Sequence, residues 1–294
     1  NGELGDSGAV EKTGAEDTLS QSLYLVIATD TTARTSYRLG NAFAIDERRV
    51  VTSASVVKAM NDLKADNTTQ DFREFELYSP IRHENFRIEN AVVHPDYDSF
   101  AETAAESARQ VEAIMAETAA ADPDTQDAEA VKKRVLDLQM KAMTAFEQRT
   151  ACDVAVLRVA EDLPFHLSGS TSQNSLRPKQ KLIVAACAFD AEDPFFSPLD
   201  DMPEMRMETR IFRIHPGTGR HSVLVISITE NPERQREYAF SGAPVLNDSG
   251  QVVAVYSLPT PPPLTMNENP AKAAEITTFD ATLFDRVREC PNGG

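Results

Sequence analysis

The sequence predicts an all-β protein that is interrupted by one pair of helices. Two observations lead to this fold class. Short apolar runs, separated by turn-forming residues, recur from Ser22 to Tyr256, as in barrels and sandwiches of antiparallel strands. Between Ser99 and Thr150 the apolar residues instead recur with the period of an α-helix. A chain of 294 residues with 41% hydrophobic residues is long enough for one large domain or two packed subdomains.

The expected strands are short, and polar or turn-forming residues flank them. The first is the run Leu23 to Ala28, and a tight turn at Asp46 to Arg48 joins the second and third. The expected strands cover 23–28, 41–46, 49–52, 75–78, 86–93, 154–159, 181–189, 205–214, 223–229, 243–246 and 252–256. Residues 1–18 contain almost no large apolar side chain, so we expect a disordered leader there and order from Ser22 onward.

Two amphipathic helices are expected in segment 99–150, as a helical hairpin inserted into the β protein. The predicted buried face of the first is formed by Phe100, Ala104, Ala108, Val111 and Met115, and that of the second by Val131, Val135, Leu138, Ala142 and Phe146. Ser99 with Glu102 has the spacing of a capping box. Asp122 followed by Pro123 is typical of a helix start. The hairpin is open to two interpretations, a stabilising decoration or an element that contacts a partner.

The C-terminal part is expected to contain a proline-rich loop and a last helix. The loop covers 259–276, where five prolines disfavour the interior of a sheet. The helix covers 277–290, with Thr278 as its cap and an apolar face that includes Leu283, Phe284 and Val287.

Charge and cysteine usage narrow the classes of function. The formal net charge is −17, which repels phosphate backbones, so we expect no nucleic-acid partner. No apolar stretch approaches the roughly 18 residues of a membrane-spanning helix, so we expect no membrane span. Cys152, Cys187 and Cys290 are odd in number and lack metal spacing. We expect neither a disulfide framework nor a metal, and no cofactor. His94 and Asp96 flank a proline, which indicates a turn.

Four motifs in register carry a resemblance to a known family. The segment Gly40 to Val57 includes V-V-T-S-A-S-V-V, segment 152–159 reads C-D-V-A-V-L-R-V, and segment 240–255 contains F-S-G-A-P-V-L-N followed by G-Q-V-V-A-V. Segment 92–97 reads V-V-H-P-D-Y. In this order they resemble the motifs of trypsin-like and HtrA-like serine proteases over residues 20–258. The resemblance implies two packed antiparallel β-barrels, 19–166 with the hairpin insertion 99–150, and 167–258.

The resemblance assigns the catalytic positions of the family to three residues. Ser241 matches the nucleophile, Asp153 matches the orienting carboxylate, and Ser55 stands where the family has histidine. A serine hydroxyl needs a base to accept its proton, and the hydroxyl of Ser55 has no basic nitrogen. The loss of one triad member costs nearly as much rate as the loss of all three. The resemblance therefore implies a pseudoprotease rather than an enzyme.

Two neighbours of Ser241 depart from the family pattern in the same direction. Ala239 stands where the family has the glycine whose N–H lines the oxyanion hole, and a distorted donor is costly for catalysis. Phe240 replaces an acidic or amide residue, and we expect its ring to repack the floor of the cleft.

Three functions remain open from the sequence. The first is an inactive protein- or peptide-binding module, in which Tyr256, Ser257 and Leu258 match the family's edge that pairs with a peptide backbone. The second is an active serine endopeptidase using Ser241 with a non-standard base, for which a Ser–Lys dyad with Lys58 is the nearest option. The third is a structural domain whose hairpin mediates assembly. The resemblance favours a bacterial-type exported or cell-envelope domain, although the cysteine usage fits any compartment.

Overall fold

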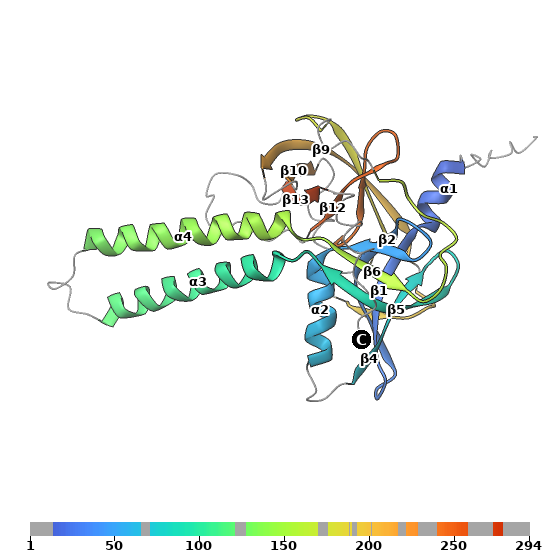
Figure 1. Ribbon diagram of the computed structural model, residues 1–294, viewed down its shortest axis with the longest axis horizontal. Helices are drawn as coiled ribbons and strands as arrows, with labels where there is room; N and C mark the ends of the chain where they lie inside the picture. The colour runs from blue at the N-terminus through green and yellow to red at the C-terminus, as the bar shows by residue number, and fades with distance from the viewer. Residues whose placement is uncertain are drawn as a thin grey trace, which may run out of the picture.

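The computed structural model describes residues 14–65, 71–120, 128–169, 176–187, 189, 193–200, 202–216, 222–228, 240–257 and 273–278. Two β-sheets form the body, and a long helical hairpin projects from it (Figure 1). The prediction of a mainly β protein with a helical hairpin is confirmed. None of the helices in the described part of the chain is long and apolar enough to cross a membrane.

The first sheet contains seven strands in the order β1-β4-β5-β6-β3-β2-β8. Its strands are β1 (Leu23–Asp30), β2 (Thr35–Ala44), β3 (Arg49–Thr52), β4 (Phe72–Ser79), β5 (Glu84–Val93), β6 (Ala155–Val159) and β8 (Phe195–Phe196). A further antiparallel pairing joins β1 to β2, from Leu23 opposite Phe43 to Asp30 opposite Thr35. Six of the strands therefore form a ring, in which apolar side chains such as Tyr24, Val26 and Leu157 are buried.

The second sheet is a closed barrel in the order β10-β13-β12-β11-β7-β9. Its strands are β7 (Lys181–Cys187), β9 (Glu204–Pro216), β10 (Ser222–Ile228), β11 (Pro244–Leu246), β12 (Val252–Tyr256) and β13 (Ala273–Thr278). Leu182, Val184 and Val245 are among the side chains buried in its core. Closure pairs every strand on both sides, so this barrel has no open edge within the described strands.

Beside these strands there are four helices in the described residues: α1 (Gly14–Gln21), α2 (Ala54–Ala65), α3 (Tyr97–Ala120) and α4 (Ala128–Ala151). The sequence indicated α3 and α4, but it did not indicate α1 or α2. Residues 14–18 were wrongly assigned to the disordered leader. Leu19 explains the order there, because its side chain is only 8% exposed in the core that joins the two barrels.

The start and the buried face of α3 differ from the predictions. The helix begins at Tyr97, so Ser99 lies inside the first turn and does not cap it. The buried side chains of α3 include Ser107 and Ile114, whereas Ala108 and Met115 are exposed. A seam spaced alternately by three and four residues fits a long antiparallel helix pair better than the regular 3.6 period. The Asp122–Pro123 start of the second helix lies outside the described residues.

The C-terminal prediction is wrong for residues 273–278. We expected a proline-rich loop as far as 276 and a helix from 277 capped by Thr278, but residues Ala273–Thr278 form β13. It lies between β10 and β12. Thr277 of β13 is opposite Val223 of β10, and Ile276 of β13 is opposite Tyr256 of β12. In the closed barrel the backbone of β13 is paired with strands on both sides. This pairing stabilises a strand although the residues of the segment have only a weak preference for strand conformation. The rest of 259–276 and 277–290 lies outside the described residues.

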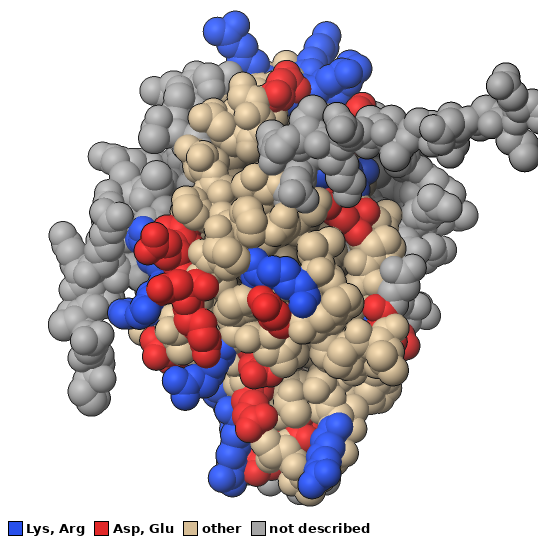
Figure 2. Space-filling view, turned by 90° about the vertical axis from the view of Figure 1, so that its right-hand side faces the viewer, with Lys and Arg blue, Asp and Glu red and all other residues tan. Residues whose placement is uncertain are grey.

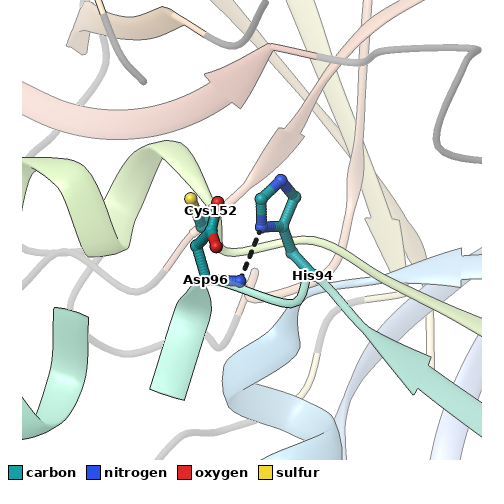
Figure 3. A group of neighbouring side chains, drawn as sticks. All are labelled: His94, Asp96 and Cys152. Atoms are coloured by element: carbon teal, nitrogen blue, oxygen red, sulfur yellow. Dashed lines mark hydrogen bonds between the residues drawn. The ribbon is translucent and has the colours of Figure 1, made fainter. Parts of the chain in front are cut away.

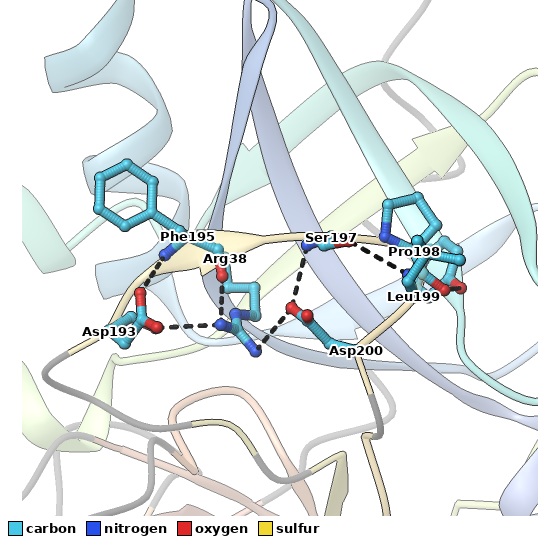
Figure 4. Close-up of polar contacts among 8 residues, drawn as sticks. Arg38, Asp193, Phe195, Ser197, Pro198, Leu199 and Asp200 are labelled. Atoms are coloured by element: carbon cyan, nitrogen blue, oxygen red, sulfur yellow. Dashed lines mark hydrogen bonds and ion pairs between the residues drawn. The ribbon is translucent and has the colours of Figure 1, made fainter.

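A short return of the chain ties the second half to the first. β8 pairs with the start of β2, with Phe195 opposite Tyr37, although it comes from the segment predicted for the second barrel. The guanidinium of Arg38 donates to the carbonyls of Asp193, at 3.1 Å, and Phe195, and it forms an ion pair with Asp200 at 3.8 Å (Figure 4). The Arg38 side chain is 8% exposed, so these contacts are shielded from water. They hold segment 193–200, which we call the strap, against β2.

Candidate functional site

The structure brings Ser55, Asp153 and Ser241 together from three separate segments. Ser55 is the second residue of α2, directly after β3. Asp153 lies between the end of α4 and the start of β6, and Ser241 lies in the turn that precedes β11. Ser55 and Asp153 therefore adjoin strands of the first sheet, and Ser241 adjoins a strand of the second barrel. The candidate site therefore lies where the two barrels meet.

A tight turn presents Ser241. The N–H of Ala243 donates to the carbonyl of Phe240 at 2.9 Å, which closes a four-residue turn. Gly242 is the third residue of this turn and has φ of 84°, as a type II turn requires. A Cβ on Gly242 would lie 2.0 Å from the backbone oxygen of Asn41 and 2.4 Å from Oγ1 of Thr52. Backbone conformation and close packing both require glycine after Ser241.

Asn41 of β2 connects this turn to the first barrel by hydrogen bonds. The sequence did not indicate this role. The N–H of Asn41 donates to the carbonyl of Ser241 at 2.7 Å, and its own carbonyl accepts the Thr52 hydroxyl at 2.7 Å. Its Oδ1 accepts the N–H of Cys187 from β7 at 2.9 Å. The side chain is 1% exposed. One buried amide therefore joins both barrels and fixes the position of Ser241.

Three serine hydroxyls meet at the centre of the site. Oγ of Ser241 lies 2.8 Å from Oγ of Ser53 and 3.3 Å from Oγ of Ser55, and the last two lie 2.9 Å apart. Ser53 and Ser241 are buried, at 0% and 4% exposed. Ser53 was not predicted as a site residue, since the family pattern leaves its position open. Each hydroxyl both donates and accepts, so the cluster satisfies itself without a basic group.

Asp153 lies on the other side of Ser55. Its Oδ1 accepts the N–H of Ser55 at 2.8 Å, and its Oδ2 accepts the Ser55 hydroxyl at 3.3 Å. The hydroxyl of Ser257 donates a third hydrogen bond. Burial raises the pKa of Asp153 despite these hydrogen bonds and the nearby charge of Arg149, which lower it. The carboxylate thus links the first barrel to the segment after β12.

The base of the helical hairpin borders this carboxylate. Tyr97 at the start of α3 is 1% exposed and packs with Ala54 and Cys152. Burial, together with the charge of Asp153, raises the pKa of Tyr97 to about 12. Arg149 near the end of α4 donates to the Tyr97 hydroxyl at 3.3 Å and lies over its ring. The base of the hairpin therefore lies close enough to Asp153 for the charge of Asp153 to affect Tyr97.

The other predicted site residues are placed as follows. Phe240 is 4% exposed and packs on the ring of Tyr256, in the core of the second barrel. Tyr256 is the last residue of β12, paired to both β11 and β13, and its side chain is 1% exposed. Ser257 is 1% exposed and faces Asp153. Ala239 and Leu258 lie outside the described residues.

The candidate bases lie away from Ser241. Nζ of Lys58 is exposed and bonds to Asp62 one helical turn on, at 3.1 Å. His83 contacts the hydroxyl of Tyr78, and His166 lines a separate surface pocket beside Leu167 and Ser168. Among the residues with described side chains, the hydrogen bonds of Ser241 Oγ go to Ser53 and Ser55. The side chains of His215 and His221 lie outside the described part of the structure.

His94, Asp96 and Cys152 gather beside the site, where β5 leads into α3 and α4 ends (Figure 3). Their potential ligand atoms lie within 4.8 Å of one another. The N–H of Asp96 donates to Nδ1 of His94 at 3.2 Å, and this bond occupies the single lone pair of that nitrogen. The imidazole of His94 thus accepts a hydrogen bond within the turn that the sequence predicted. A metal ion could bind Nδ1 only after the hydrogen bond from the Asp96 N–H was broken.

The face of the molecule away from the hairpin carries charges of both signs. Figure 2 shows acidic and basic side chains interspersed over this face, with a large uncharged area between them. Among the described residues drawn in this view, the net charge of −17 is not gathered into one acidic field, and the basic side chains form no continuous stripe.

Comparison with models of protein families gives no match, and neither does comparison with curated proteins. Solved structures do match. The protease Rv3671c from M. tuberculosis, in its active form, superposes with a TM-score of 0.50 and 13% identity, over 95% of this chain and 86% of the protease. Neuropsin, a serine protease of mouse brain, superposes with a TM-score of 0.51 and 10% identity, over 92% and 96%. The chain therefore has the trypsin-like serine protease fold.

Proposed function

We propose that this chain is a catalytically inactive trypsin-like domain that acts as a protein- or peptide-binding or scaffolding module. The observation that carries the proposal is the surroundings of Ser241 Oγ. Its described partners are the hydroxyls of Ser53 and Ser55, at 2.8 and 3.3 Å. A hydroxyl is too weak a base at neutral pH to take the proton of an attacking serine.

The position of Ser55 supports the same conclusion. It occupies the space between Asp153 and Ser241, where the resemblance expects an imidazole, and its own hydrogen bonds reach both residues. The buried carboxylate of Asp153 accepts hydrogen bonds from the backbone and hydroxyl of Ser55 and from the hydroxyl of Ser257, in place of an imidazole. Loss of the base is expected to reduce turnover by about four to six orders of magnitude relative to an intact triad.

The binding half of the proposal concerns the chain around β12. Its backbone is paired on both sides as far as Tyr256, so a peptide strand is expected to add beyond this residue, along Ser257 and Leu258. The hairpin, whose base packs through Tyr97 against Ala54, offers a second surface for a protein partner. Main-chain pairing of this kind gives affinity without catalysis.

Covalent labelling tests the inactive state. We expect a fluorophosphonate probe to leave the purified chain unlabelled at neutral pH, because Ser241 lacks a base to activate it. The measurement is intact-protein mass spectrometry, with Ser241→Ala as the matched control and an active trypsin-like protease as the positive control. Stoichiometric labelling that Ser241→Ala abolishes would reject the proposal and favour the alternative, an active endopeptidase with a non-standard base.

A further inference from the structure

The hairpin of α3 and α4 extends far from the barrels (Figure 1), and large apolar side chains are exposed along it. In the described residues Met115 is 61% exposed, Leu136 56% and Met140 55%. Soluble proteins rarely concentrate such side chains on one projecting element without a partner.

These side chains share one face of the hairpin. The seam between the helices includes Ile114 and Val135, and Met115 and Leu136 each follow a seam position. In an antiparallel pair, residues that follow a seam position lie on the same side. Met140 lies one turn beyond Leu136. We call this surface the outer face: Ala105, Ala108, Met115, Leu136, Met140 and Met143.

The opposite side of the hairpin is polar. Glu106 bonds to Arg109 at 2.7 Å and to Gln110 at 2.8 Å, and the charge of Lys141 on α4 further lowers the pKa of Glu106. These contacts satisfy the polar side within one hairpin. The outer face has a different composition and is the side on which an apolar partner fits.

The two helices carry opposite charge, which identifies the partner. α3 has five acidic residues and one basic residue, a net of −4, whereas α4 has five basic and three acidic residues, a net of +2. A second hairpin turned so that its α4 lies over α3 meets the opposite charge along both helices. Glu112 and Lys132 are exposed and follow seam positions, so they border the outer face.

We propose that a second copy of this chain occupies the outer face, with α3 of each copy packed against α4 of the other. Helices of 24 residues are about 36 Å long and each about 10 Å wide. One face of the pair therefore offers roughly 700 Å² per copy, close to the ~800 Å² per partner of a stable interface.

The oligomeric state of the full chain tests this proposal. By sedimentation velocity we expect a dimer for the wild-type chain, and Leu136→Glu to raise its Kd by about 100-fold, as for a central apolar anchor. Leu199→Glu is the matched control, since Leu199 is 94% exposed and lies outside the hairpin, in the segment after β8, which pairs with β2. It should leave the dimer unchanged, and circular dichroism should show equal helix content in all three chains.

A charge exchange separates pairing between copies from effects on folding. Glu112→Lys and Lys132→Glu should each weaken self-association, because each variant places like charges opposite each other. A mixture of the two variants should form a heterodimer, in which both pairs attract. A wild-type chain that stays monomeric at its highest soluble concentration overturns the proposal. So does a dimer that Leu136→Glu leaves intact, and so does a monomer that binds anionic phospholipid vesicles through the same face.

Discussion

Ser55→His alone is expected to give no turnover above that of Ser241→Ala, although it restores the residue type of the family. Two features of the site prevent a simple repair. Ser53 holds the Ser241 hydroxyl at 2.8 Å, so the nucleophile is directed away from an incoming imidazole. The carbonyl of Ser241 is fixed by Asn41, so the turn cannot shift freely to make room for the ring.

A stepwise series should then recover activity. Adding Ser53→Ala frees the Ser241 hydroxyl to bond to the new imidazole, and adding Ala239→Gly restores the residue type of the oxyanion-hole turn. We expect the triple variant to exceed the single one by about 100-fold or more, with gains that are more than additive, because base, nucleophile and donors act together. Phe240 is left unchanged, since a carboxylate in its buried position would destabilise the core.

The measurement is hydrolysis of an activated ester and of a peptide library by each variant. Each member of the series is compared with the same chain carrying Ser241→Ala, which removes the nucleophile and reports contaminating activity. Strong turnover by Ser55→His alone would show that the nucleophile and the oxyanion hole are intact, and that only the base is missing.

Asp153→Ala is expected to lower the free energy of unfolding by about 2–4 kcal/mol, through buried donors left without an acceptor. The carboxylate is 5% exposed and accepts hydrogen bonds from the Ser55 backbone and from two serine hydroxyls. Asp153→Asn keeps an acceptor for the Ser55 N–H and resembles the protonated acid that burial favours. It should therefore stay close to the wild-type chain in stability.

The pH dependence separates these two variants further. The folded pKa of Asp153 is raised, so the native state binds its proton more tightly than the unfolded chain, whose aspartate titrates near about 3.9. The stabilisation that comes from protonation is fully present below the unfolded pKa, and it is lost as pH rises through the folded pKa. Relative to Asp153→Asn, the wild-type chain should gain stability as pH falls through this window.

Urea unfolding of the three chains over a series of pH values measures this difference, and the Asn variant cancels the contribution of the other carboxylates. An Ala variant as stable as the wild type would show that Asp153 is not the buried acceptor described here. A wild-type chain that loses stability relative to Asn as pH falls would show that the folded pKa of Asp153 is lowered rather than raised.

Much of the fold was readable from the sequence because its signals are local. Alternation and β-branched residues indicated most of the strands, and the helical period indicated α3 and α4. β13 was missed because Ala273 to Thr278 has little strand character by itself and is ordered by barrel closure. Strand β8 in the strap has two residues and depends on Arg38, far away in the chain.

The site was predictable only in part, for the same reason. Motif order predicted Ser55, Asp153 and Ser241 as site residues, and the structure places Ser55 within hydrogen-bond distance of both Asp153 and Ser241. Ser53 and Asn41 were not identified, because their roles come from contacts between barrels rather than from spacing along the chain. Ser257 was expected at a peptide-binding edge, and the contact with Asp153 could not be inferred without the fold.

Peptide cleavage by the unmodified chain tests the central claim most directly. Wild type and Ser241→Ala are incubated in parallel with casein and with a defined peptide library, and the products are read by mass spectrometry. We expect the two chains to give identical product profiles, with any retained peptides recovered intact, because the described partners of Ser241 Oγ are hydroxyls, which are too weak as bases to activate it. New peptide ends produced by the wild-type chain and absent with Ser241→Ala would contradict the account and identify an active protease.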